Sequence, residues 1–185
     1  IPKHAFQNMS ALEEVVLPEG LETISNYAFK DCYGLSVLTL PSTVNVIGDY
    51  SFYGCNGIRM INMNDTLESI GNSAFYGCSG LLSLVLNDGL ITLGDSAFKN
   101  CINLTAVEIP KSVVNMAENS FENCAKIVIY CYSGSKAHII SESIGYHFSL
   151  LDEHVHEYQV TTETEATCLR GGTIIKTCNI CGYNY

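Results

Sequence analysis

The chain contains no tryptophan, no long apolar run and few basic residues, and each shortage excludes a class of function. Nine lysines and arginines stand against 19 aspartates and glutamates, for a net charge of −10 over 185 residues. Such a chain has no basic patch to neutralise phosphates, so we expect neither nucleic-acid binding nor attraction to an anionic membrane surface. No apolar run reaches the length of about 18 residues that a membrane span needs, so direct membrane insertion is not expected. Without tryptophan or an aromatic row on the expected sheet, carbohydrate binding is disfavoured.

The sequence also lacks the motifs of catalysis. It has no phosphate-binding glycine loop, no paired histidine and nucleophile, and no recurring pair of carboxylates. The Asn64-Asp65 and Asn87-Asp88 turns lack the additional acidic ligands of a calcium loop. We therefore expect a protein that is not an enzyme.

What the sequence does contain is a repeat of 23 residues. Phenylalanine recurs at this spacing, at Phe6, Phe29, Phe52, Phe75, Phe98 and Phe121. Three residues after each phenylalanine come Met9, Cys32, Cys55, Cys78, Cys101 and Cys124. Further apolar columns begin at Leu12, Val15, Leu17, Leu21 and Ile24. Columns in phase over so many copies indicate a solenoid, in which no unit can bury its apolar face alone and each stacks on the next.

One unit predicts two short extended segments joined by turns. Leu84 and Leu86 alternate with outward residues, as in a strand whose leucines point into the core. A proline or asparagine then ends that strand, and a second extended piece carries the apolar pair Leu90-x-x-Leu93. A glycine leads into the residues expected to cap a single helical turn that holds the Ala-Phe pair, which are Asp49, Asn72 and Asp95.

The pattern LxxLxLPxxLxxIGxxAFxxCxxL, present in residues 35–58, resembles the BspA-like leucine-rich repeat of bacterial surface proteins. The resemblance extends over about residues 1–150. It implies an α/β, mostly β, right-handed solenoid with a parallel β-sheet on the concave face and short helical turns on the other side. Residues 127–150 depart from the repeat and resemble the family's terminal cap, with Ser135 placed to begin a helix from about Lys136 to Ile144 and Gly145 to end it.

The same resemblance implies a non-enzymatic protein of the bacterial cell surface or extracellular space. Its solenoid would bind other proteins, host matrix or partner-cell components among them, and would act as a monomer without a cofactor. The alternatives are a structural spacer that presents another domain, and a zinc-stapled C-terminal module with a binding role of its own. Because the chain begins partway through a repeat, we expect any signal peptide to lie outside this sequence.

The strand positions that face out of the core are the candidate binding residues. On a leucine-rich repeat they would line the concave sheet, which is the usual recognition surface. They are Val37, Thr39, Met60, Asn62, Ser83, Val85, Ala106 and Glu108. Two alternatives stay open: a merely solvated scaffold, and a contact surface on the other side formed by the tyrosines Tyr27, Tyr50, Tyr53 and Tyr76.

The cysteine column, Cys32 to Cys124, is interpreted as a set of buried thiols that fill volume. Stacked cysteines would have Cα atoms near the lower limit for a disulfide, but equivalent side chains project in parallel. The repeat body offers only His4 as an imidazole base. Disulfides, and a metal-binding or catalytic role, are the alternatives, and Cys131 is left unassigned.

Residues 151–185 leave the repeat and predict a small β module that needs a staple. The Cys-x-x-Cys-Gly spacing lets two thiolates reach one tetrahedral Zn²⁺, and a third thiolate with one imidazole would complete a structural site. The candidate ligands are His154, His156, Cys168, Cys178 and Cys181. One disulfide with a free thiol, or a redox centre, are the alternatives.

The zinc interpretation predicts about one equivalent of bound zinc in protein purified without added metal, because a closed thiolate site holds its ion tightly. Metal analysis of the purified chain measures this directly. Less than about half an equivalent would contradict the zinc site and favour the disulfide or free thiols.

Overall fold

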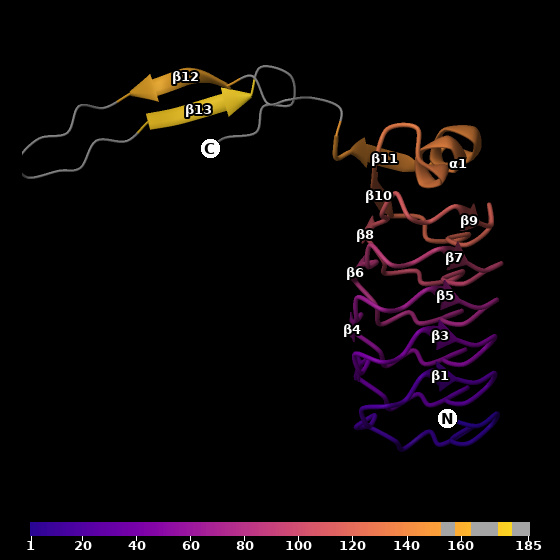
Figure 1. Cartoon of the computed structure of the whole chain (residues 1–185). Helices are drawn as coiled ribbons and strands as arrows, with labels where there is room; N and C mark the ends of the chain where they lie inside the picture. Colours follow the sequence, from indigo (N-terminus) through magenta and orange to yellow (C-terminus); the bar gives the residue numbers. More distant parts are fainter. Residues whose placement is uncertain (153–157, 164–173, 179–185) are drawn as a thin grey trace, which may run out of the picture. The chain divides into compact units, whose positions relative to one another are not determined.

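The structure, a computed structural model, describes residues 1–152, 158–163 and 174–178 (Figure 1). Contacts divide the chain into two units, residues 1–151 and residues 152–185, and each is described by itself. In the second unit the strands β12 (Tyr158–Glu163) and β13 (Ile174–Cys178) pair antiparallel, with a register shift between Val160 and Thr162.

The first unit is a stack of coils, each of which contributes two short strands. On one side lie three-residue strands, β2 (Val37–Thr39), β4 (Met60–Asn62), β6 (Ser83–Val85) and β8 (Ala106–Glu108). On the other side lie two-residue strands, β1 (Thr23–Ile24), β3 (Val46–Ile47), β5 (Ser69–Ile70), β7 (Thr92–Leu93) and β9 (Asn115–Met116). Their paired neighbours are parallel and lie 23 residues apart in sequence, as in Val37↔Met60 and Thr23↔Val46. The predicted mostly-β parallel solenoid is confirmed.

A cap closes the last coil as the sequence predicts. It consists of β10 (Val128–Cys131), α1 (Lys136–Ile144) and β11 (His147–Leu150), with β11 parallel to β10. The Ser135 hydroxyl accepts a hydrogen bond from His138 N at 3.2 Å, and Gly145 ends the helix at a left-handed φ of 85°. Cys131 is buried as the last residue of β10.

The phenylalanine column forms the centre of the core. The rings of Phe29, Phe52, Phe75, Phe98 and Phe121 are fully buried. Successive rings stack nearly parallel, and the distance between the centroids of neighbouring rings runs from 4.9 Å for Phe6–Phe29 to 5.5 Å for Phe98–Phe121. Each ring is therefore buried by the coils above and below it, so the core cannot exist in a single unit.

The expected single helical turn around the Ala-Phe pair is instead a run of turns. Ala28 N donates within its own coil to Ser25 O at 3.2 Å, whereas Phe29 N donates to Ser51 O of the next coil at 2.7 Å. Tyr27 and Asp31 both have a left-handed φ of 61°, which an α-helix of L-residues does not allow. Backbone amides of this segment bond partly within their own coil and partly to the next coil, and these hydrogen bonds take the place of those of a helix.

The residues expected to cap those helical turns also bond between coils. Asn26 Oδ1 accepts from Asp49 N at 3.0 Å, and Asp49 Oδ1 accepts from Asn72 N at 2.7 Å. Asn72 Oδ1 accepts from Asp95 N at 2.9 Å. Asparagine and aspartate alternate along this ladder, which keeps the carboxylates of Asp49 and Asp95 two coils apart and limits their repulsion.

The cysteine column is buried and free of disulfides, as interpreted from the sequence. Its members do more than fill volume, because each Sγ donates to the carbonyl of the phenylalanine 26 residues earlier, as in Cys55–Phe29 at 3.0 Å and Cys78–Phe52 at 3.4 Å. Burial raises the pKa of Cys55 to about 12 and raises that of Cys78 well above its usual value. The thiols of Cys55 and Cys78 are therefore neutral hydrogen-bond donors in the folded chain.

Replacing Cys78 with alanine should lower the free energy of unfolding by about 1–2 kcal/mol, because it removes a buried sulfur and the donor to Phe52 O. Urea denaturation followed by circular dichroism measures the change. An unchanged midpoint at an unchanged slope would contradict this assignment.

Candidate binding face

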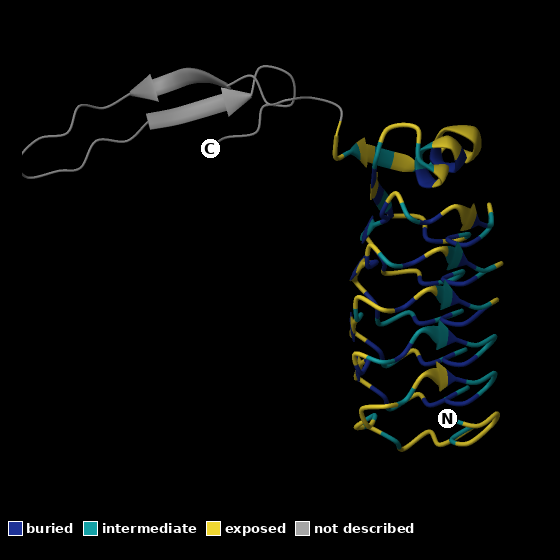
Figure 2. Cartoon of the chain, in the orientation of Figure 1, coloured by how far each residue is buried: buried dark blue, intermediate teal, exposed yellow. Residues whose placement is uncertain are grey.

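The eight predicted binding residues lie on one face, which we call the strand face. They occupy the outward positions of β2, β4, β6 and β8, and Figure 2 shows exposed and buried stretches of backbone alternating along this side of the stack. One row contains Val37, Met60, Ser83 and Ala106, and the other contains Thr39, Asn62, Val85 and Glu108. The six residues on β2, β4 and β6 are exposed, whereas Ala106 and Glu108 are half-buried. Alternation along each strand therefore sets which side chains a partner could touch.

The strand face is interrupted between β4 and β6. Strands β2 and β4 form one sheet and β6, β8, β10 and β11 another, and within the described solenoid no ladder hydrogen bond joins β4 to β6. On the opposite side of the same two coils β5 and β7 stay paired, with Ser69 opposite Thr92. The turns between them also stay bonded, as in Phe52 N to Ala74 O at 2.8 Å. The coils thus separate on the strand face alone.

The interruption coincides with a change of sequence in the two flanking coils. Where other coils end the strand with a proline, these carry Asn64 and Asn87. The Asn87 Nδ2 donates to Leu67 O at 3.0 Å, and the Asn64 Nδ2 donates to the Pro41 and Val44 carbonyls. The Oδ1 atoms of both asparagines are buried without a hydrogen-bond partner. Each coil that flanks the interruption therefore carries a buried, unpaired carboxamide oxygen after its strand.

A cleft of about 380 Å³ occupies the interruption. Its apolar walls come from Met60, Ile61, Met63, Leu84 and Val85. Asn62, Ser83 and Asn87 supply polar atoms, and charged groups lie before and after β4, as Arg59 and Asp65. The volume is at the lower end of the range for small-molecule sites, so the cleft can admit a side chain of a partner.

Four of the eight predicted residues line this cleft, namely Met60, Asn62, Ser83 and Val85. Val37, Thr39, Ala106 and Glu108 lie on the strands to either side. Asn62 Nδ2 donates to Thr39 Oγ1 at 3.0 Å, which links the cleft to β2. Reasoning from the sequence missed Arg59, Asp65 and Asn87. The signal that could have found them is the loss of proline in two successive coils.

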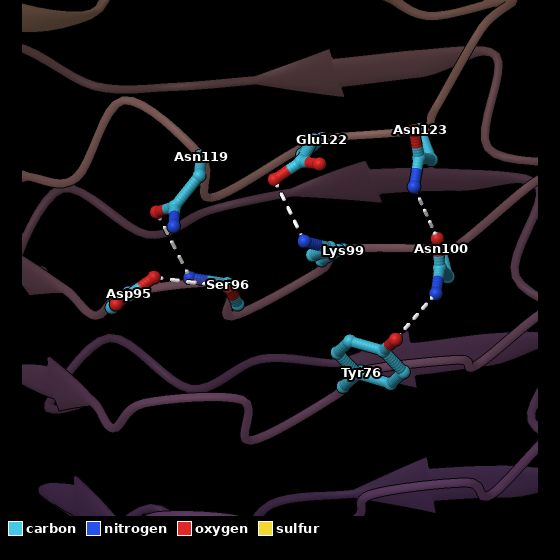
Figure 3. Close-up of polar contacts among 8 residues, drawn as sticks. All are labelled: Tyr76, Asp95, Ser96, Lys99, Asn100, Asn119, Glu122 and Asn123. Carbon is cyan, nitrogen blue, oxygen red and sulfur yellow. Dashed lines mark hydrogen bonds and ion pairs between the residues drawn. The ribbon is translucent and has the colours of Figure 1, made fainter.

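The tyrosines considered as a second contact surface are largely used between coils. Tyr27 and Tyr50 stack at 5.0 Å between ring centroids, and Tyr53 and Tyr76 stack at 4.7 Å. The Tyr76 hydroxyl accepts from Asn100 Nδ2 at 2.6 Å (Figure 3). These rings are half-buried, and their faces cover one another. These tyrosines therefore pack between coils and leave little surface free for a partner.

Above Tyr76 the same edge continues as a polar ladder, also drawn in Figure 3. Asn123 Nδ2 donates to Asn100 Oδ1 at 2.8 Å, and the Lys99 ammonium pairs with the Glu122 carboxylate at 2.8 Å. These contacts join equivalent positions of neighbouring coils and so help to hold the stack together.

The predicted zinc ligands His154, His156, Cys168 and Cys181 lie outside the described residues. Cys178 is the last residue of β13, where the backbone alone is described. Among the residues that the structure describes, no group of three or more histidines, cysteines or carboxylates could hold a metal ion. The zinc site stays a prediction. The described part of the chain also has no helix long and apolar enough to cross a membrane.

Comparisons with known proteins identify the repeat. A family model described as a BspA type leucine rich repeat region matches residues 1–128 in six copies. The crystal structure of a T. pallidum leucine-rich repeat protein is 31% identical, covers 61% of this chain and 54% of its own, and superposes with a TM-score of 0.59. A leucine rich cell surface protein of Faecalibacterium prausnitzii is 31% identical, covers 66% of this chain and 32% of its own, and has a TM-score of 0.62.

The pneumococcal vaccine antigen PcpA shares the fold, with a TM-score of 0.53 at 19% identity over 72% of this chain and 38% of its own. No curated protein sequence matches the chain. The chain spans about half of the T. pallidum protein and about a third of the F. prausnitzii protein.

Proposed function

Since the chain belongs to the BspA-type leucine-rich repeat family, we propose that it is a surface or extracellular protein whose strand face binds another protein. Leucine-rich repeat proteins are generally non-enzymatic scaffolds that bind proteins. The similar structure from F. prausnitzii is described as a cell surface protein, and this supports a surface location. The partner would be a protein met outside the cell, such as a host matrix or partner-cell component.

The observation that carries this proposal is the exposed apolar surface around the cleft. The Met60 side chain is 55% exposed and Val85 62% exposed, on strands that flank the interruption. Val37 continues the Met60 row on β2 and is also exposed. Exposed apolar side chains that flank a cleft can be covered by a partner, and covering them gains free energy.

Protein capture tests the proposal with a charge-matched pair of variants. The full chain is immobilised and exposed to an extracellular-matrix extract, and the bound proteins are quantified by mass spectrometry. Met60→Lys/Val85→Lys should reduce capture by about tenfold or more, because it places two positive charges in the centre of the contact.

The matched control is Ile91→Lys/Val114→Lys, which adds the same charge at exposed residues next to the two-residue strands of the other side. This variant should stay within about twofold of the parent. Equal loss in both variants, or no enrichment by the parent chain, would contradict binding by the strand face and favour a spacer.

A further inference from the structure

We propose that the cleft between β4 and β6 is the specificity pocket of the strand face and that it takes a lysine side chain of the partner protein. This inference rests on the proposed function, because it names the chemistry that the partner must present to that face. The walls of the cleft, its charges and the backbone groups left without ladder partners between β4 and β6 support it.

The walls suit the long apolar stem of lysine. Met60, Met63 and Val85 line the cleft, and Met63 is only half-buried where the equivalent Leu40 and Leu86 are buried. Methionine side chains are flexible and polarisable, so they can close around an unbranched chain of methylene groups. Lysine buries such a stem readily while its ammonium group remains in contact with polar atoms.

The charges favour a cation at one end. Asp65 lines the cleft beyond the end of β4 and takes part in none of the ion pairs seen among the described residues. Because the whole chain carries a net charge of −10, its field also attracts a basic group and repels an acidic one.

Arg59 makes the two ends of the cleft differ in charge. It lines the cleft just before β4, whereas Asp65 lies beyond the end of the same strand. An ammonium group is therefore drawn towards Asp65 and kept away from Arg59. An acidic side chain would be held towards Arg59 against the negative field of the chain, and a purely apolar one would gain nothing from Asp65.

The missing ladder supplies further acceptors. Because β4 and β6 share no ladder hydrogen bonds, their backbone groups that face the interruption lack the partners that paired strands provide. An ammonium group has three donors and no acceptor. It can donate to the Asp65 carboxylate and to unpaired carbonyls at the same time, which neither a hydroxyl nor a methyl group can do.

Methionine NMR provides a direct test, because the chain has only four methionines. Two of them, Met60 and Met63, line the cleft, and Met9 and Met116 lie in other coils and serve as internal controls. The full chain, labelled at the methionine methyl carbons, is titrated with N-acetyl-lysine methylamide. The methyl signals of Met60 and Met63 should shift saturably, and those of Met9 and Met116 should stay in place.

Two analogues and two variants distinguish the contribution of the ammonium group to binding from that of the apolar stem. N-acetyl-norleucine methylamide, which keeps the stem without the charge, should bind about fivefold or more weakly, and the glutamate analogue should not shift the signals. Asp65→Asn should lower the affinity for the lysine probe by about threefold to tenfold and leave the affinity for the norleucine probe unchanged. Asp88→Asn, at the equivalent exposed position of the next coil, is the matched control and should change affinity by less than about twofold.

The proposal is overturned if all four methyl signals respond alike, if the glutamate probe binds as well as lysine, or if Asp65→Asn and Asp88→Asn weaken binding equally. Its failure is distinguishable from failure of the proposed function. Capture that depends on Met60 and Val85 without any response to the lysine probe overturns the lysine pocket alone. If Met60 and Met63 respond saturably but the chain captures no protein, the pocket is supported and the proposed protein partner is contradicted.

Discussion

Everything in the solenoid depends on the stacking of one coil directly on the next at a spacing of 23 residues. A phenylalanine ring is buried only because the rings of the coils above and below cover it, at about 5 Å between centroids. The same register places thiols under carbonyls and carboxamides beside backbone amides of the next coil. A column of equivalent residues therefore acts as one structural element, and its chemistry follows from what neighbouring copies do to each other.

That register explains why much of the fold could be predicted from the sequence. The apolar columns, the outward positions of β2, β4 and β6, and the cap helix that begins after Ser135 all follow from residue type at a fixed spacing. The turns around the Ala-Phe pair could not be predicted in the same way. Their amides bond to the next coil, as Phe29 N does to Ser51 O, and a pattern within one unit cannot reveal a partner in another.

The interruption between β4 and β6 is harder still to predict, because each flanking coil taken alone has an ordinary repeat. Met63 and Asn64 stand where other coils have an aliphatic residue and proline, and neither replacement is unusual in a turn. The two flanking coils share the asparagine, whose carboxamide bonds to the preceding coil while its oxygen stays unpaired. The candidate binding residues were therefore identifiable, but the cleft that brings four of them together was not.

Among the described strands of the strand face, the neighbours β4 and β6 alone lack a ladder, so the stack is open between them on that face. Fixed strands hold Met60 and Val85 in position on either side of the cleft, and the paired strands β5 and β7 keep the coils from separating further. Such a surface needs little ordering when a partner binds, and that lowers the entropic cost of recognition.

Hydrogen exchange followed by mass spectrometry measures whether the ladder is open between β4 and β6. Amides of residues 59–63 and 82–86 should exchange about tenfold or more faster than those of residues 105–109, whose strand is paired on both sides, while the turn residues 71–77 stay protected. Equal protection of these three strand segments would contradict an opening between β4 and β6.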